Sequence, residues 1–288
     1  MKKNYFFSAV LAIAATVACT EKGPVDFPIQ GDLTLYGENV AEQEVGVFVT
    51  SEGLPQSNLL YTGAKGEGAV ALTAKAEKAG FKQGNHTIYA YAPYAEGAEL
   101  TAVPVDYSKQ STVAFDPLAD DEILAGLMLS YNSTAQSVLY ATTEVTELSS
   151  AAITLPFAAV NPLTEVTVGE PGLEGTNANA QEGKKVTKIV VTCDKPIAYT
   201  GQTLDLTTGK LVGGTAVNSI EIAADMTVKK MGYVTANGFT FKTCLTEEEV
   251  ATAKFKIEMV METGKTYAAE DKTPSYGGIY ALTLTEVE

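Results

Sequence analysis

An all-β fold is predicted by this sequence, and three observations predict it. Short runs of alternating apolar and polar residues recur along the chain, which is typical of half-buried strands. Clusters of Gly, Pro, Asn and Asp separate these runs about every ten residues, as turns between strands require. Of the 288 residues, 45% are hydrophobic and 19% are charged, which is sufficient for a core. Many short strands with turns between them favour antiparallel β-sandwiches over βαβ units.

The first segment predicts export. Met1-Lys2-Lys3 is basic, and the uncharged run from Phe6 to Ala18 follows it. As a helix this run would span about 20 Å, less than the ~30 Å hydrocarbon core of a bilayer. A short apolar run that ends in small residues is typical of a secretory signal peptide, which we place at residues 1–18.

The end of this segment resembles a bacterial lipobox. Thr16-Val17-Ala18-Cys19 matches the pattern in which the chain is cut before a cysteine whose thiol is acylated, although Thr16 stands where Leu is usual. Cys19 is therefore the predicted lipidation site, and acyl chains such as palmitate would anchor the exported protein in the outer membrane. The alternative is an ordinary signal sequence with an incidental Cys19.

The rest of the chain carries the strand pattern. In Lys254–Met261, Phe255, Ile257 and Met259 alternate with charged residues, which predicts a half-buried antiparallel strand. Thr246-Glu247-Glu248-Glu249 is a capping-box pattern that supports a turn or two of helix. The predicted strands include Leu33–Tyr36, Val45–Thr50, Ala69–Thr73, Thr87–Tyr94, Ile123–Leu129, Val138–Thr142, Ala151–Phe157, Lys188–Cys193, Lys254–Met261 and Ile279–Val287.

Length and loop composition indicate two domains. At ~150 residues per domain, 288 residues make one large or two modest domains. An apolar strand ends before Asn161-Pro162, and Gly169–Lys185 is rich in Gly, Asn and Glu. We therefore predict an N-terminal β-sandwich domain over residues 19–160 and a C-terminal one over residues 161–288.

Absent residue types exclude several kinds of chemistry. All 20 basic side chains are lysines, Trp is absent, His86 is the only histidine, and the net charge is −15. Without Arg the chain lacks the planar fork that grips phosphate or guanine, and its charge repels nucleic acid. One histidine cannot form a His-based metal cage. We predict no enzyme activity, no catalytic residues, no cofactor or metal, and no nucleic-acid partner.

The remaining candidates for chemistry are weak. His86 follows Gln83-Gly84-Asn85, so we expect an exposed histidine at a turn edge. Asp120-Asp121-Glu122 with Asp116 could hold calcium, but a solvated acidic loop is the favoured interpretation. Cys193 and Cys244 differ in strand phase, which favours two separate thiols and leaves a disulfide open.

An ordered set of motifs resembles the fimbrillin family, the major and minor fimbrial subunits of Bacteroides-type bacteria. The motifs are Glu44–Val49, Ile88–Tyr94, Asp120–Ala125 and Ile153–Phe157, and together they cover roughly residues 40–160. The resemblance implies two transthyretin-like β-sandwiches in tandem after a lipoprotein signal peptide. It also implies a structural subunit, stalk or anchor, of a cell-surface fimbria (pilus) that supports cell adhesion, with other fimbrial subunits as partners.

The resemblance further implies assembly by β-strand donation. In the family a protease removes the first strand, and the C-terminal strand of a neighbour fills the groove. The removable strand would lie within Leu33–Val40 and include Leu33, Leu35 and Tyr36. The donor would be Ile279–Val287, with Ile279, Tyr280, Leu282 and Leu284 as its apolar residues, the last three alternating onto one face. The family's processing is Arg-specific and this chain has no Arg, so either another protease acts or the first strand stays.

A second function class remains open. A surface-exposed, glycan-binding outer-membrane lipoprotein would use aromatic platforms to hold sugar rings. Zero Trp residues count against this class, whereas 14 Tyr residues leave room for it.

Overall fold

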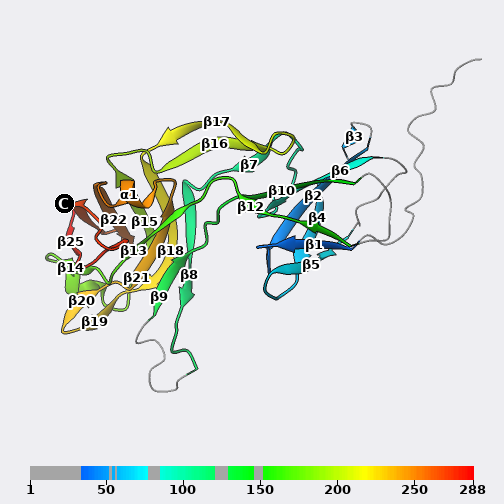
Figure 1. The fold of residues 1–288 in the computed structure, drawn as a ribbon. Helices are drawn as coiled ribbons and strands as arrows, with labels where there is room; N and C mark the ends of the chain where they lie inside the picture. The colour runs from blue at the N-terminus through cyan, green and yellow to red at the C-terminus, as the bar shows by residue number, and fades with distance from the viewer. Residues whose placement is uncertain (1–33, 52–53, 56, 77–84, 121–128, 146–151) are drawn as a thin grey trace, which may run out of the picture.

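The computed structural model describes residues 34–288 except 52–53, 56, 77–84, 121–128 and 146–151. Among these residues, all elements are strands apart from one α-helix, α1 (Glu247–Val250), and one 3₁₀ turn, η1 (Ala178–Gln181). Two major curled sheets form a β-rich two-domain architecture (Figure 1). The all-β prediction is confirmed.

The first sheet curls until its two ends are joined by one segment of chain. Its order is β11-β1-β5-β4-β2-β6-β10-β12, with β3 attached to β2. β11 and β12 lie at opposite ends of this order, yet only Pro156 and Phe157 separate them in sequence. The strands are β1 (Leu35–Glu38), β2 (Glu44–Ser51), β3 (Leu54–Pro55), β4 (Leu59–Gly63), β5 (Ala69–Ala74), β6 (His86–Ala92), β10 (Leu139–Val145), β11 (Ile153–Leu155) and β12 (Ala158–Ala159).

The second sheet is longer and takes strands from both halves of the chain. Its order is β19-β20-β14-β25-β23-β22-β15-β18-β8-β9-β21-β13-β24, and a separate small sheet has the order β17-β16-β7. The strands are β7 (Val103–Val105), β8 (Lys109–Phe115), β9 (Ser130–Ser133), β13 (Thr164–Val168), β14 (Gly172–Glu174), β15 (Lys185–Cys193), β16 (Ala198–Asp205), β17 (Lys210–Val217), β18 (Ser219–Thr227), β19 (Lys229–Met231), β20 (Tyr233–Thr235), β21 (Gly238–Thr243), β22 (Phe255–Met261), β23 (Thr266–Lys272), β24 (Gly278–Ile279) and β25 (Thr283–Glu286).

Two parallel segments close the second sheet. β13 continues into β14, and β24 continues into β25, so each segment passes between distant positions in the sheet order. The segments stay paired across the bend, because Gly169 N donates to Ile279 O at 2.8 Å and Gly172 N donates to Leu282 O at 2.9 Å. The C-terminal strand is therefore internal to this sheet and does not form its edge.

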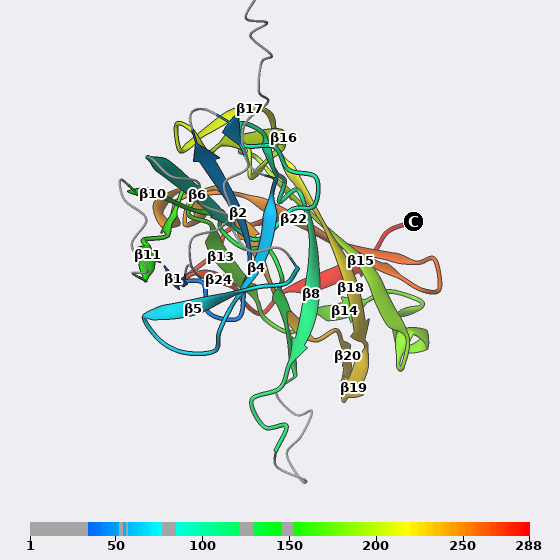
Figure 2. The ribbon, with the colours of Figure 1, turned by 90° about the vertical axis from the view of Figure 1, so that its right-hand side faces the viewer.

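The 13-stranded sheet and the small β17-β16-β7 sheet together make up what we call the second sheet system. Strands from before residue 160 are built into it. β8 pairs in parallel with β18, β9 pairs in parallel with β21, and β7 pairs antiparallel with β16. Figure 2 shows β8 lying beside β18. The main core joins residues of both halves, such as Tyr107, Tyr131, Ile222 and Phe239. The boundary at 160/161 stays a prediction. The three pairings join strands that precede it in the sequence to strands that follow it.

Two local predictions are confirmed. The capping box is formed, because Thr246 Oγ1 accepts from Glu249 N at 3.2 Å and the Glu249 carboxylate accepts from Thr246 N at 2.9 Å. In β22, Phe255, Ile257 and Met259 are fully buried, as the alternation indicated. Of the predicted strand Ile123–Leu129, residues 123–128 lie outside the described part of the chain.

The prediction for His86 is wrong. His86 is the first residue of β6 and is only 2% exposed. β6 lies between β2 and β10, and both neighbours reach this residue, with Ser51 and Val145 as its register partners. Strands on both sides bury a side chain that the preceding turn residues suggested would be exposed.

Candidate strand-exchange site and junction cleft

β1 occupies a slot between one parallel and one antiparallel neighbour, which we call the β1 slot. Leu35, Tyr36 and Gly37 pair in parallel with residues 153–155 of β11, and β1 pairs antiparallel with β5. The predicted Leu35 points inward and is 1% exposed, whereas Tyr36 is half-buried on the other face. The predicted Leu33 lies outside the described residues.

The inner end of the β1 slot is tightly packed. A Cβ on Gly37 would lie 2.5 Å from Val40 Cγ2 and 3.0 Å from Phe157 Cε2, so this position requires glycine. Asn39 Nδ2 donates to Phe157 O at 3.2 Å and fixes the turn after the strand. Removing residues 35–40 would uncover the facing edges of β5 and β11 together with buried Leu155 and Phe157.

The C-terminal strand occupies a slot of the same kind, which we call the β25 slot. β25 pairs in parallel with β14 and antiparallel with β23. β1 likewise has a parallel neighbour, β11, and an antiparallel neighbour, β5. In both slots the strand therefore has one parallel and one antiparallel neighbour.

The predicted donor residues do not share one face. Ile279, Leu282 and Leu284 are buried, at 4%, 3% and 0% exposure, whereas Tyr280 is 55% exposed. The alternation breaks because Ala281 has a φ of +52°, which turns the backbone between β24 and β25. The prediction that Tyr280, Leu282 and Leu284 line one face is wrong for Tyr280. The ring of Tyr280 instead covers the backbone of Gly278, whose added Cβ would lie 2.7 Å from ring atoms.

A charged clamp holds the end of β25. The Glu286 carboxylate accepts from Asn177 Nδ2 at 2.6 Å and from Asn177 N at 3.0 Å, and Lys265 Nζ lies 2.9 Å from Glu286 Oε1. These contacts, led by the Asn177 amide, lower the pKa of Glu286 to about 2. Sequence reasoning missed this clamp because Asn177 and Glu286 are far apart in the chain.

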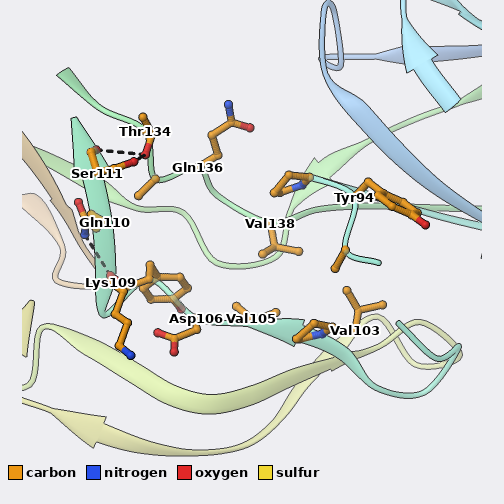
Figure 3. A pocket seen from close by; sticks show the side chains of 15 residues that line it. Tyr94, Val103, Val105, Asp106, Lys109, Gln110, Ser111, Thr134, Gln136 and Val138 are labelled. Atoms are coloured by element: carbon orange, nitrogen blue, oxygen red, sulfur yellow. Dashed lines mark hydrogen bonds between the residues drawn. The ribbon is translucent and has the colours of Figure 1, made fainter. Parts of the chain in front are cut away.

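A cleft of about 510 Å³ lies at the junction of the two domains, and sequence reasoning missed it too. Figure 3 shows Tyr94 on one side of it and Asp106 and Lys109 on the other. The wall near Tyr94 follows β6, whereas β7 and β8 belong to the second sheet system. The lining residues are Pro93, Tyr94, Ala95, Val103, Pro104, Val105, Asp106, Tyr107, Lys109, Gln110, Ser111, Thr134, Ala135, Gln136 and Val138.

The two thiols are unbridged. Cys193 is buried, and burial raises the pKa of its thiol to about 11, so it remains protonated at neutral pH. Cys244 is partly buried, and burial raises the pKa of its thiol as well. The favoured interpretation of two separate thiols agrees with this arrangement.

The acidic cluster lies partly outside the described residues. Asp121 and Glu122 are not described, and Asp116 Oδ1 accepts from Leu118 N at 3.0 Å within a turn. Within the described ranges, no group of three or more His, Cys, Asp or Glu side chains is placed to share a metal ion. None of the helices in the described part of the chain is long and apolar enough to cross a membrane. The predicted lipidation site, Cys19, also lies outside the described residues.

Comparison with known proteins finds structural likeness at low identity. No family model and no curated protein matches the chain. A candidate cell adhesion protein of Bacteroides uniformis has a TM-score of 0.42 and 15% identity, covering 88% of this chain and 92% of its own. A candidate cell adhesion protein of Bacteroides ovatus has a TM-score of 0.38 and 17% identity, covering 91% and 96%. A fimbrial assembly protein of Parabacteroides distasonis has a TM-score of 0.31 and 14% identity, covering 87% and 90%. At TM-scores this low the likeness assigns neither a function nor an assembly mechanism to this chain.

Proposed function

We propose that this chain is a structural subunit of a cell-surface fimbria that polymerises by β-strand donation between subunits. The observation that carries the proposal is the equivalence of the β1 and β25 slots, each with one parallel and one antiparallel neighbour. The C-terminal strand of one subunit would enter the β1 slot of the next and pair with the same polarity as β1 does. Backbone hydrogen bonds would then replace those lost with β1.

The side chains favour one register of insertion. Leu282 and Leu284 are buried and lie two residues apart, and Leu33 and Leu35 have the same spacing in the sequence. With Leu284 in the place of Leu35, burial of each leucine side chain would stabilise the complex by about 1.5–3 kcal/mol. The tight packing at Gly37 disfavours a register in which Leu284 replaces that glycine, because Phe157 leaves no space for a side chain.

Disulfide locks test the exchange by tethering each strand in its own slot. Tyr36 faces Thr154 across β1 and β11, and Ala268 faces Thr285 across β23 and β25. Neighbouring strands lie about 4.7–4.9 Å apart, which is within the range of Cα separations that a disulfide spans. The double variants Tyr36→Cys/Thr154→Cys and Ala268→Cys/Thr285→Cys would lock β1 and β25 respectively.

The expected results of the two locks differ. When oxidised, the chain with β1 locked should donate but not accept a strand, and the chain with β25 locked should accept but not donate. Each should stop polymers that form again after reduction, with the single-cysteine variants as controls. Polymers of normal length from the oxidised β25-locked chain would rule out the C-terminal strand as donor. A charged substitution such as Leu282→Asp would not separate the two cases, because β25 is internal to its sheet and this change would also weaken the monomer.

The proposal includes export as an outer-membrane lipoprotein. Cys19 ends a short apolar run, so Cys19→Ala should abolish lipid attachment and release or stall the protein. Detergent-phase partitioning of the variant, with Cys244→Ala as the matched cysteine control, measures this. Unchanged partitioning of Cys19→Ala would contradict the lipoprotein assignment.

A subunit that retains β1 would act as an anchor or cap. The chain contains no Arg, so an Arg-specific protease has no site between the lipidated end and β1. N-terminal sequencing of the protein from its native membrane decides whether β1 is removed. A start at Cys19 in assembled fibres would favour the anchor or cap role, and a start beyond Val40 would favour the stalk role.

A further inference from the structure

We propose that the junction cleft binds a neutral saccharide of one or two pyranose rings, a binding function separate from strand exchange. Its volume of about 510 Å³ suits a ligand of this size. It lies where two domains meet, a position that small-molecule sites often occupy. Neither the β1 slot nor the β25 slot contributes a residue to its lining, so occupancy of the cleft and assembly can be measured separately.

The wall on the first-domain side is preorganised. The hydroxyl of Tyr91, a fully buried residue, accepts from Ala95 N at 3.2 Å and from Asn58 Nδ2 at 2.9 Å. Asn58 Nδ2 also donates to Ala95 O at 2.8 Å. These bonds hold the backbone that carries Pro93, Tyr94 and Ala95, so little ordering is needed when a ligand binds.

The opposite wall is preorganised by Gln110. Its Nε2 donates to Tyr107 O at 3.1 Å and to Lys242 O at 2.6 Å. Its Oε1 accepts from Ser133 Oγ at 2.7 Å and from Lys242 N at 3.1 Å. Asp106 is fixed as well, because its Oδ1 accepts from Ser108 N at 2.9 Å and from Ser108 Oγ at 2.7 Å.

The polar rim matches the hydroxyl groups of a sugar. Asp106 offers an acceptor, Lys109 a donor, and Gln136 both, and all three side chains are exposed. Ser111 and Thr134 add a hydroxyl pair, with their oxygens 2.7 Å apart. One carboxylate and one ammonium balance each other, which favours a neutral ligand, and the net charge of −15 disfavours acidic polysaccharides.

Flat apolar surfaces complete the match. Pro93 and Pro104 are exposed and Tyr94 is half-exposed, so their faces are open to the C–H face of a pyranose ring. Val103, Val105 and Val138 form a buried apolar floor. Sugar rings present C–H groups on their faces and hydroxyls at their edges. The apolar side chains of the lining suit the ring faces, and the polar rim suits the hydroxyls.

The test is titration of the full chain with the neutral disaccharides cellobiose, maltose and lactose, followed by calorimetry and NMR. At least one of the three should bind, and Gln136→Ala and Tyr94→Ala should each weaken that binding at least about fivefold. Tyr276→Ala is the matched control, because Tyr276 is a fully exposed tyrosine outside the cleft. Thermal melts establish that each variant is folded, and polymer formation should be unchanged in all three.

Three outcomes would overturn the proposal. The first is that none of the disaccharides binds. The second is that both cleft variants bind as tightly as the original chain. The third is that Tyr276→Ala weakens binding as much as they do.

Discussion

The β1 slot and the β25 slot receive their strands in the same orientation but hold the strand ends differently. At the end of β1, Asn39 Nδ2 donates one hydrogen bond to Phe157 O, and the turn packs closely around Gly37. At the end of β25, the Glu286 carboxylate is held by Asn177 and Lys265. Donation of the C-terminal strand must therefore first break a charge-assisted clamp, whereas loss of β1 chiefly exposes apolar surface.

The two domains also differ in self-sufficiency, and breaking the chain between them should have the largest effect. The fragment 161–288 lacks β7, β8 and β9, and β8 and β9 connect β18 to β21 in the sheet order. We expect this fragment alone not to fold cooperatively, as followed by circular dichroism and NMR dispersion. A fragment 98–288 restores these strands and is the control. Cooperative melting of 161–288 near the midpoint of the full chain would contradict the pairing of β8 with β18.

A single substitution in the β25 slot should have the next largest effect. Leu284 is fully buried between β14 and β23. Leu284→Ala should lower the free energy of unfolding by about 2–5 kcal/mol, because it removes buried methyl groups and leaves a cavity. The matched control is Thr285→Ala, an exposed neighbour expected to change stability by less than about 0.5 kcal/mol. Equal effects of the two changes in urea unfolding would show that β25 is not held in its slot in solution.

A substitution in β6 tests the stability of the first domain at a position outside the β1 slot. His86 is buried between β2 and β10, so His86→Ala should lower the free energy of unfolding by about 1–3 kcal/mol. Chemical denaturation measures this change. A change below about 0.5 kcal/mol would fit the exposed position that the sequence predicted.

The smallest expected effect is on the pH dependence of the clamp. The pKa of Glu286 is lowered from 4.5 to about 2, so the stabilisation is complete above about pH 4.5 and is lost as the pH falls towards 2. Glu286→Gln should melt below the original chain at neutral pH, and the difference should shrink over that interval. Glu174→Gln, an exposed carboxylate on neighbouring β14, is the control. A difference that stays constant from pH 7 to pH 2 would show that the carboxylate charge is not what holds β25.

Local features could be predicted from the sequence, and long-range ones could not. The alternation in β22 and the capping box at Thr246 depend on residues a few positions apart, so their pattern is visible in the chain. The parallel pairing of β8 with β18 joins residues more than a hundred positions apart, and no local pattern indicates it. The same holds for the burial of His86, which its neighbouring strands impose.

The candidate site shows the same division. The sequence predicted that Leu35, Leu282 and Leu284 are apolar strand residues, and all three are buried. It did not predict that Tyr280 lies on the other face. The left-handed conformation of Ala281 breaks the strand alternation, and an alanine in the sequence does not indicate such a conformation. The clamp at Glu286 and the junction cleft each need segments that only the fold brings together.

The insertion of β7, β8 and β9 into the second sheet system has a mechanical consequence. In a fibre under tension, force would enter one domain through the β1 slot and leave through the C-terminal end. The chain passes between the first sheet and the strands of the second domain three times: between β6 and β7, between β9 and β10, and near Asn161 between β12 and β13. Tension between the two domains would therefore be shared among three chain segments rather than carried by one linker. Each subunit would therefore carry load as a single stiff rod, and the exchanged strands between subunits would be the places where such a fibre yields.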